Sequence, residues 1–387
     1  MSRSHEDLRN LLDALLRRAV EVGASDIHLK VGSKPKMRIN GQLYAVKSED
    51  RLSPNDTMSM VDAIMPDHVK GRFAEVGDAD FAFSDPKVGR FRVNTFRQRG
   101  SVGLVLRHVT YGVDSIAELG LPRVVQRLAD EPRGLVLVTG PTGSGKTTTL
   151  AAMVDHINST RNCHIVTIED PIEILHRDKR ASINQREIGL DSKSFATAMR
   201  AALRQDPDVI LVGEMRDPET VNAALQAAET GHLVLSSMHT TDASETVNRI
   251  IEFFPHQQHR QVRATLASAL RGTLGQRLVP AANGEGRVPV TEAMVVTGRV
   301  AQAIVDMEAT ASLADLIAEG DYYGMQTFDQ GLADLVSRRL ITVEAAMSAA
   351  SRPHDLRVAM ERAGVLDHRG NHRDDLLGHL NGVTGVS

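Results

Sequence analysis

The chain has 387 residues, enough for two domains, and its 42% hydrophobic and 24% charged residues exclude a disordered, collagen-like or coiled-coil protein. The net charge of −4 disfavours a dedicated nucleic-acid binder, and the single cysteine, Cys163, excludes an intrachain disulfide and a four-thiolate zinc site within the chain. Because no stretch approaches the roughly 18 apolar residues of a spanning helix and the N-terminus is too polar for a secretory signal, we expect a cytoplasmic protein.

Residues 1–110 are predicted to form a small α+β domain. In residues 5–22, Leu8, Leu12 and Leu15 recur at the spacing of one helical face, with Ser4 as the predicted N-cap and Gly23 at the end. Short alternating segments such as "SDIHLKV", "GRFRVNTFRQRG" and "GLVLRHV" follow, separated by turns rich in Gly, Pro and Asp. These segments predict an antiparallel sheet.

A different pattern begins after a connector punctuated by Gly and Pro, and we place a hinge linker at residues 111–116. In residues 117–365, helical patterns alternate with continuous apolar runs such as "GLVLVTG", "HIVTIED", "DVILVGE", "HLVLSSMH" and "VPVTEAMVV". Strands buried on both faces lose the polar alternation of half-exposed strands, so this α/β domain is predicted to hold a parallel sheet with helices on both sides. The polar residues 366–387 are predicted to be a disordered tail.

Residues 140–147, "GPTGSGKT", match the phosphate-binding pattern G-x4-G-K-S/T between a predicted strand and a predicted helix. The glycines let backbone N–H groups converge on a phosphate at the positive end of the helix, whereas a glycine-rich turn without a ligand is the structural alternative. Lys146 is predicted to contact the β- and γ-phosphates and Thr147 to bind Mg²⁺, so the expected cofactors are ATP and Mg²⁺. The predicted nucleotide contacts here are Gly140, Pro141, Thr142, Gly143, Ser144, Gly145, Lys146, Thr147 and Thr148.

Three apolar runs end in polar residues at the edge where α/β sheets bind ligands. Glu214 closes "DVILVGE" and is expected to hold Mg²⁺ through its water shell, while Glu169 in "HIVTIED" is the candidate base that polarises the attacking water. His239 ends "HLVLSSMH" and is expected to sense the γ-phosphate. With Lys146 these residues form the predicted catalytic set, but spacing leaves open which glutamate is the base and which holds the metal. Helix-capping acids and a structural histidine are the alternatives.

Four blocks stand in order along the chain: "GPTGSGKTT", "TIEDPIE", "ALRQDPDVILVGEMRDPET" and "SSMHTTDASETVNRIIEFFP". They resemble the Walker A, Asp box, Walker B and His box of the secretion ATPase superfamily that drives type II secretion and type IV pili. "GASDIHLKVGSKPKMRINGQL" and "GMQTFDQGLADLVSRRLIT" resemble its pilus-retraction, or twitching motility, branch. The resemblance implies a PAS-like N-terminal domain, a RecA-like ATPase domain and a homohexamer. It also implies work on a polytopic inner-membrane platform protein, with a paralogous ATPase as a further partner and no nucleic acid.

Four arginines are also expected at the nucleotide. Arg92 and Arg107 resemble N-terminal-domain arginines that close over it, so that ATP would lie between the two domains. Arg200 and Arg204 resemble arginines that reach a neighbouring subunit's site. Cations delivered across a subunit boundary stabilise the charge-rich transition state of phosphoryl transfer. For each arginine, an exposed or ion-paired side chain is the structural alternative.

Three other functions remain open at this point. The nearest is a pilus extension or type II secretion ATPase that lacks the usual cysteine-bound zinc insertion. A RecA-like nucleic-acid translocase would need a basic, aromatic channel, and only 3% of the residues are aromatic, with no Trp. The third is a nucleotide sensor that assembles without hydrolysis.

Overall fold

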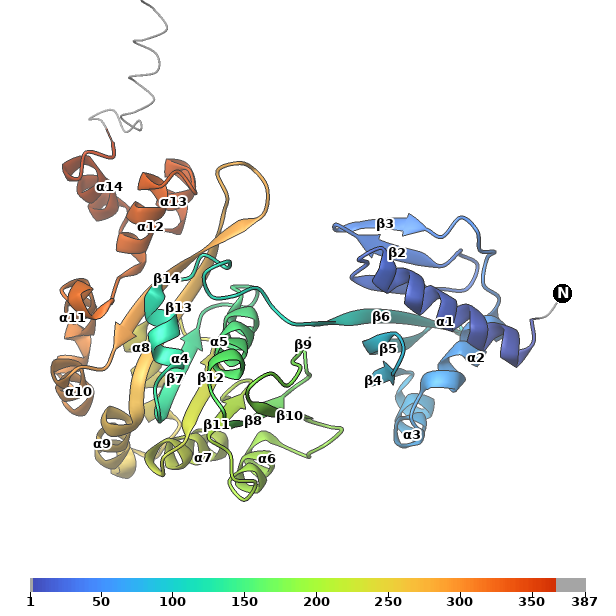
Figure 1. Cartoon of the computed structure of the whole chain (residues 1–387), viewed down its shortest axis with the longest axis horizontal. Helices are drawn as coiled ribbons and strands as arrows, with labels where there is room; N and C mark the ends of the chain where they lie inside the picture. The colour runs from blue at the N-terminus through green and yellow to red at the C-terminus, as the bar shows by residue number, and fades with distance from the viewer. Residues whose placement is uncertain (1–2, 367–387) are drawn as a thin grey trace, which may run out of the picture. The chain divides into compact units, whose positions relative to one another are not determined.

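The computed structural model describes residues 3–366 of the chain, which divides into two compact units, Met1–Tyr111 and Gly112–Ser387. Each unit has its own sheet and its own buried hydrophobic residues (Figure 1). Of the predicted polar tail, residues 367–387 lie outside the described part. Within residues 3–366, no helix combines the length and the apolar character that crossing a membrane requires.

The first unit is an antiparallel sheet accompanied by helices. Its strands lie in the order β3-β2-β1-β6-β5-β4, and every neighbouring pair is antiparallel, as the alternating segments predict. In chain order the elements are α1 (His5–Glu21), β1 (Asp26–Leu29), β2 (Lys36–Ile39), β3 (Gln42–Ala45), α2 (Pro54–Ile64), α3 (Asp67–Val76), β4 (Asp78–Asp85), β5 (Gly89–Gln98) and β6 (Ser101–Tyr111).

Helix α1 begins where the sequence predicts. The Ser4 side chain accepts a hydrogen bond from the Asp7 backbone N–H, and the Asp7 carboxylate accepts one from Ser4, which closes a capping box. The predicted apolar face of α1 is buried, and Leu12 and Leu16 have no exposed surface. These leucines belong to the same buried cluster as Leu104 of β6, so the helix shields one face of the sheet.

The second unit is built on a mostly parallel sheet whose strands lie in the order β10-β8-β11-β12-β7-β13-β14. All neighbouring pairs from β10 to β13 are parallel, as predicted. The strands of this unit are β7 (Gly134–Thr139), β8 (His164–Glu169), β9 (Ile174–Leu175), β10 (Ser182–Glu187), β11 (Val209–Val212), β12 (Leu233–Met238), β13 (Leu270–Pro280) and β14 (Arg287–Val295).

One strand departs from the prediction. The run "VPVTEAMVV" was expected in the parallel sheet, but it forms β14, which is antiparallel to β13. Only residues 281–286 separate the two strands, and so short a connection joins antiparallel neighbours, since a parallel pair needs a long crossover. The β13–β14 hairpin therefore closes one edge of the sheet.

Helices cover both faces of this sheet and continue beyond it towards the C-terminus (Figure 1). The α-helices are α4 (Arg123–Ala129), α5 (Lys146–Thr160), α6 (Phe195–Ala202), α7 (Pro218–Glu229), α8 (Ala243–Glu252), α9 (His259–Ala269), α10 (Gly298–Val305), α11 (Leu313–Ala318), α12 (Phe328–Ser337), α13 (Val343–Ala349) and α14 (Pro353–Arg362). Single 3-10 turns are η1 (His256–Gln258), η2 (Ala309–Ser312) and η3 (Asp321–Tyr323).

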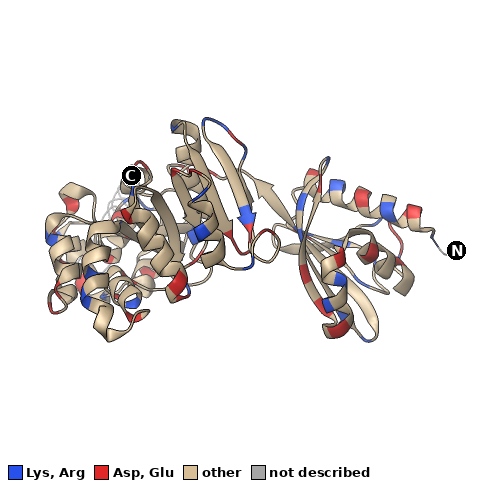
Figure 2. Cartoon of the chain, turned by 90° about the horizontal axis from the view of Figure 1, so that it is seen from below, with Lys and Arg blue, Asp and Glu red and all other residues tan. Residues whose placement is uncertain are grey.

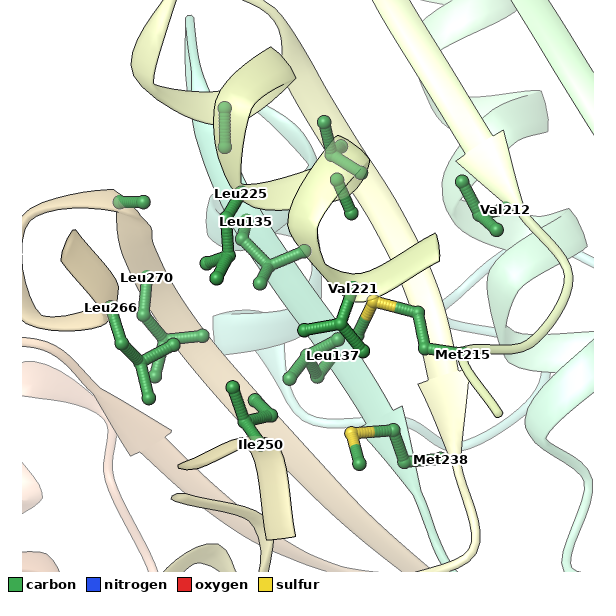
Figure 3. Close-up of a cluster of buried hydrophobic side chains, with 14 of the residues drawn as sticks. Leu135, Leu137, Val212, Met215, Val221, Leu225, Met238, Ile250, Leu266 and Leu270 are labelled. Carbon is green, nitrogen blue, oxygen red and sulfur yellow. The ribbon is translucent and has the colours of Figure 1, made fainter. Parts of the chain in front are cut away.

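Strand β7 shows why its sequence lacks polar alternation. Leu135 and Leu137 enter a cluster that includes residues of α7, such as Leu225 (Figure 3). Val136 and Val138, between and after them, enter a second cluster with residues of α4 and α5. All four side chains are fully buried, and each such burial stabilises the fold by about 1.5–3 kcal/mol. The strand that leads into the phosphate loop is thus held from both sides.

Candidate active site

The phosphate loop connects the end of β7 to the start of α5. Gly140, Gly143 and Gly145 have positive φ values of 138°, 79° and 91°, which L-residues with a side chain rarely adopt. A Cβ at Gly140 would lie 2.3 Å from the backbone oxygen of Gln276 on β13. The loop conformation therefore requires glycine both for its dihedral angles and for the close approach of the next strand.

Lys146 opens helix α5 and is 9% exposed. Its Nζ donates hydrogen bonds to the backbone oxygens of Gly140 and Pro141, at 2.8 and 3.1 Å. Burial lowers the pKa of Lys146, and the nearby Glu214 carboxylate opposes this shift. The ammonium group is therefore folded onto the loop itself, beside the place where phosphates would bind.

A cavity of about 530 Å³ opens at this loop. The loop residues Thr142, Gly143, Gly145, Lys146, Thr147 and Thr148 line it, whereas the Ser144 side chain is buried. The carboxyl ends of the neighbouring strands contribute Glu169, Asp170, Glu173, Glu214 and His239. The tertiary structure thus brings the predicted catalytic residues to one cavity of the second unit.

Glu169 is the last residue of β8 and is 8% exposed. Burial raises the pKa of Glu169, although hydrogen bonds from Thr167, Gln185 and the Glu173 backbone favour its charged form. Its Oε1 accepts hydrogen bonds from the Thr167 hydroxyl at 2.6 Å and from the Gln185 side-chain amide at 3.1 Å. The carboxyl group is therefore held in place and is more basic than an ordinary glutamate.

Glu214 follows β11, the strand next to β8, and its environment has the opposite effect. Burial alone would raise the pKa of Glu214, but Arg216 and His239 outweigh it and hold the pKa below the ordinary value. The Arg216 guanidinium lies 2.7 Å from Glu214 Oε2, and His239 Nε2 lies 3.1 Å from Oε1. Both carboxylate oxygens of Glu214 therefore have a partner, Arg216 on one side and His239 on the other.

The four arginines predicted to contact the nucleotide lie away from the cavity at the phosphate loop. Arg92 and Arg107 are exposed and stand directly opposite each other on β5 and β6. Arg107 Nε donates a hydrogen bond to Asp26 at 2.9 Å. Arg200 and Arg204 are exposed at and beyond the end of α6, where Arg204 donates to the Arg200 backbone oxygen at 3.1 Å. None of the four lines the cavity at the phosphate loop.

Among the residues that sequence reasoning missed at this site, three have polar side chains that contact the loop or Glu169 or line the cavity. Gln185 of β10 bonds to Glu169, Gln276 of β13 bonds to the phosphate loop, and the exposed Arg287 of β14 lines the cavity. The two glutamines belong to polar strand segments, "SINQRE" and "GQRLVP", which carry no strong strand signal. Arg287 comes from the hairpin whose antiparallel pairing was not predicted.

Comparison with known proteins places the chain among the secretion and type IV pilus ATPases. The sequence profile of the family described as type II/IV secretion system protein matches residues 2–345. The chain is 43% identical to the type IV pilus retraction ATPase PilT of Pseudomonas aeruginosa, over 88% of this chain and 98% of that one. It is 41% identical to the type IV pilus ATPase PilU of the same species, over 92% of each. A crystal structure of the pilus retraction motor PilT with bound ADP superposes with a TM-score of 0.81 at 45% identity, covering 88% and 97% of the two chains.

Proposed function

Because the chain belongs to the type II/IV secretion system protein family, we propose that it is an ATPase motor that powers pilus retraction and twitching motility. Its similarity to PilT and PilU over nearly their whole lengths supports the retraction branch. Figure 2 shows Lys and Arg interspersed with Asp and Glu in both units, a charge pattern that does not favour a nucleic acid as the substrate of the motor. The proposal is therefore a motor that acts on protein partners.

The observation that carries the proposal is the pair of glutamates beside the phosphate loop. Their environments shift the two pKa values in opposite directions, upwards for Glu169 and downwards for Glu214. When their environments push the pKa values of two carboxyl groups apart, one commonly acts as the base and the other stays ionised. We therefore assign Glu169 as the base that orients and deprotonates water and Glu214 as the residue that stays ionised near the metal.

The residues around the cavity suit MgATP. Backbone N–H groups of the loop and the N-terminus of α5 would bind the phosphates, and the Lys146 ammonium would turn from the loop carbonyls to the β- and γ-oxygens. The exposed Thr147 hydroxyl and the Glu214 carboxylate are oxygen donors of the kind that Mg²⁺ prefers. When bound, Mg²⁺ would neutralise charge that develops on the phosphate oxygens.

The remaining parts of the proposal concern the assembly. We propose a homohexamer at the cytoplasmic face of the inner membrane, attached through a polytopic platform protein and accompanied by a paralogous ATPase. Hydrolysis moves such a partner only if the partner binds the ATP and ADP states with different affinity. Arg92, Arg107, Arg200 and Arg204, exposed in this chain, are the candidates for completing the site within the ring.

Purified full-length protein tests the enzymatic part. We expect Lys146→Ala to lose both ADP binding and ATP hydrolysis, because the phosphate charge loses its buried counter-charge. Glu169→Gln should retain ADP binding while kcat falls by about 10²–10⁴-fold, the usual contribution of a general base. The matched control is Glu75→Gln, which changes an exposed glutamate on α3. Wild-type hydrolysis in both site variants would refute the assignment.

A cellular experiment tests the motor direction. A deletion strain complemented with the Lys146→Ala variant should carry surface pili and fail to twitch if the protein retracts pili. A strain without pili would instead identify an extension or secretion ATPase. Stimulation of ATP hydrolysis by DNA at moderate salt would favour a translocase, and absence of phosphate release by the wild type would favour a sensor.

A further inference from the structure

Gln276 lies on β13, one residue beyond the point where this strand pairs with the end of β7. Its side chain is 2% exposed and meets two residues of the phosphate-binding element. Nε2 donates a hydrogen bond to the Ser144 backbone oxygen at 2.7 Å, and Oε1 accepts one from the Thr149 hydroxyl at 2.7 Å. One amide therefore connects the loop to the first turn of α5.

The orientation of this amide follows from the chemistry of its partners. A backbone carbonyl only accepts hydrogen bonds, so the NH₂ group must face Ser144, and the oxygen then receives the Thr149 hydroxyl. Thr149 is 1% exposed, and water cannot readily replace either contact. Both bonds therefore depend on the glutamine alone.

The bond to Ser144 also determines the direction of a neighbouring N–H group. In a planar trans peptide, the Ser144 C=O and the Gly145 N–H point in opposite directions. Holding the carbonyl towards β13 aims the Gly145 N–H away from that strand, and Gly145 lines the cavity. Gln276 also explains why position 145 has no side chain, since a Cβ there would lie 2.7 Å from Nε2.

We propose that Gln276 is a positioning residue for the nucleotide, which holds the phosphate loop in its binding conformation through Ser144 and Thr149. It ties the loop to the β13–β14 hairpin, so a displacement of β13 at Gln276 would be transmitted to the loop through these two hydrogen bonds. The inference rests on the proposed nucleotide-binding function. Gln276 touches no reacting atom in this arrangement and acts through the loop.

The substitution Gln276→Glu gives a test with its own readout. A protonated carboxyl group supplies one donor and one acceptor, as the amide does, whereas a carboxylate presents only acceptors and repels the Ser144 oxygen. We measure the dissociation constant of ADP by calorimetry at pH 5.5 and pH 8.5, with wild-type protein and the variant. The variant should bind like the wild type at low pH and about tenfold or more weakly at high pH, since a buried acceptor left unsatisfied is costly.

The matched control is Gln326→Glu. Gln326 also donates from its amide to a backbone oxygen of the same hairpin, that of Thr291, at 2.9 Å, but it has no bond to the loop. This control should show the pH dependence of the wild type, which separates the loop effect from general destabilisation of the hairpin. Circular dichroism at both pH values establishes that each variant is folded.

Two results would overturn the inference: a folded Gln276→Glu variant with wild-type affinity at both pH values, or one with weak affinity at both. If that variant does not fold at pH 8.5, Thr149→Val provides the test instead, because it removes the hydroxyl that bonds to Gln276 and keeps the shape of the side chain. We expect it to weaken ADP binding several-fold, and unchanged affinity would refute the proposal. Failure of the wild type to bind ADP would instead refute the proposed function itself.

Discussion

Glu292 of β14 is a buried carboxyl group outside the cavity at the phosphate loop, and it makes the stability of the second unit depend on pH. It is 8% exposed, and its Oε1 accepts a hydrogen bond from the Ala243 backbone N–H, at the start of α8, at 2.8 Å. Burial raises the pKa of Glu292 from 4.5 to about 7, with Asp242 and Asp329 adding to the shift. The Ala243 N–H and the Arg277 guanidinium oppose it.

The sign and size of the effect follow from this shift. Between pH 4.5 and about 7 the folded state binds more protons at Glu292 than the unfolded state, so the free energy of unfolding falls as the pH rises. A difference of about 2.5 pKa units corresponds to about 3 kcal/mol. The contribution is fully present below pH 4.5 and lost above about pH 7.

The substitution Glu292→Gln removes the ionisation and keeps an oxygen that accepts the Ala243 N–H. We expect the variant and the wild type to have similar free energies of unfolding at pH 5. At pH 8 the variant should be more stable, by up to about 3 kcal/mol. Urea unfolding followed by circular dichroism at both pH values measures the difference, with Glu229→Gln, exposed at the end of α7, as the control. A difference between variant and wild type that does not change with pH would refute the reasoning.

Two further predictions concern the catalytic carboxylate and the core. Thr167→Val removes the 2.6 Å hydrogen bond that favours ionised Glu169, so the pKa of Glu169 should rise. The acid limb of the pH–kcat profile should then move to higher pH, and an unmoved limb would contradict the role of Glu169 as the base. Leu137→Ala leaves a cavity on a fully buried strand and should lower the free energy of unfolding by about 2–5 kcal/mol, and a loss below about 1 kcal/mol would contradict tight packing there.

The phosphate loop and the directions of most strands were predictable because their signals are local. Gly140, Gly145 and Lys146 occupy one short segment, and its strand–loop–helix context is visible in the neighbouring residues. The fold prediction is confirmed for the antiparallel first unit and for the parallel strands of the second. Glu169 and Glu214 were identified as candidates because each follows an apolar run, and parallel strands bring such ends to one edge.

Other features of the site depend on pairs of residues that are distant in the sequence. Gln276 contacts Ser144 across 132 positions, and Gln185 reaches Glu169 from a polar edge strand. Neither contact has a local pattern, since a polar residue within a strand segment is equally compatible with a solvent-facing position. The antiparallel direction of β14 was missed because the polar end of β13 was not identified as a strand, so the short connection of residues 281–286 could not indicate a hairpin.

By itself the sequence determined which residue types stand at the phosphate loop and at the ends of the buried strands, because periodicity and turn chemistry act between near neighbours. Only the tertiary structure decided how the two glutamates differ. Burial and the Thr167 and Gln185 bonds act on Glu169, while Arg216 and His239 act on Glu214. A pKa depends on desolvation and on charges a few ångströms away, and these distances exist only once the strands have packed side by side.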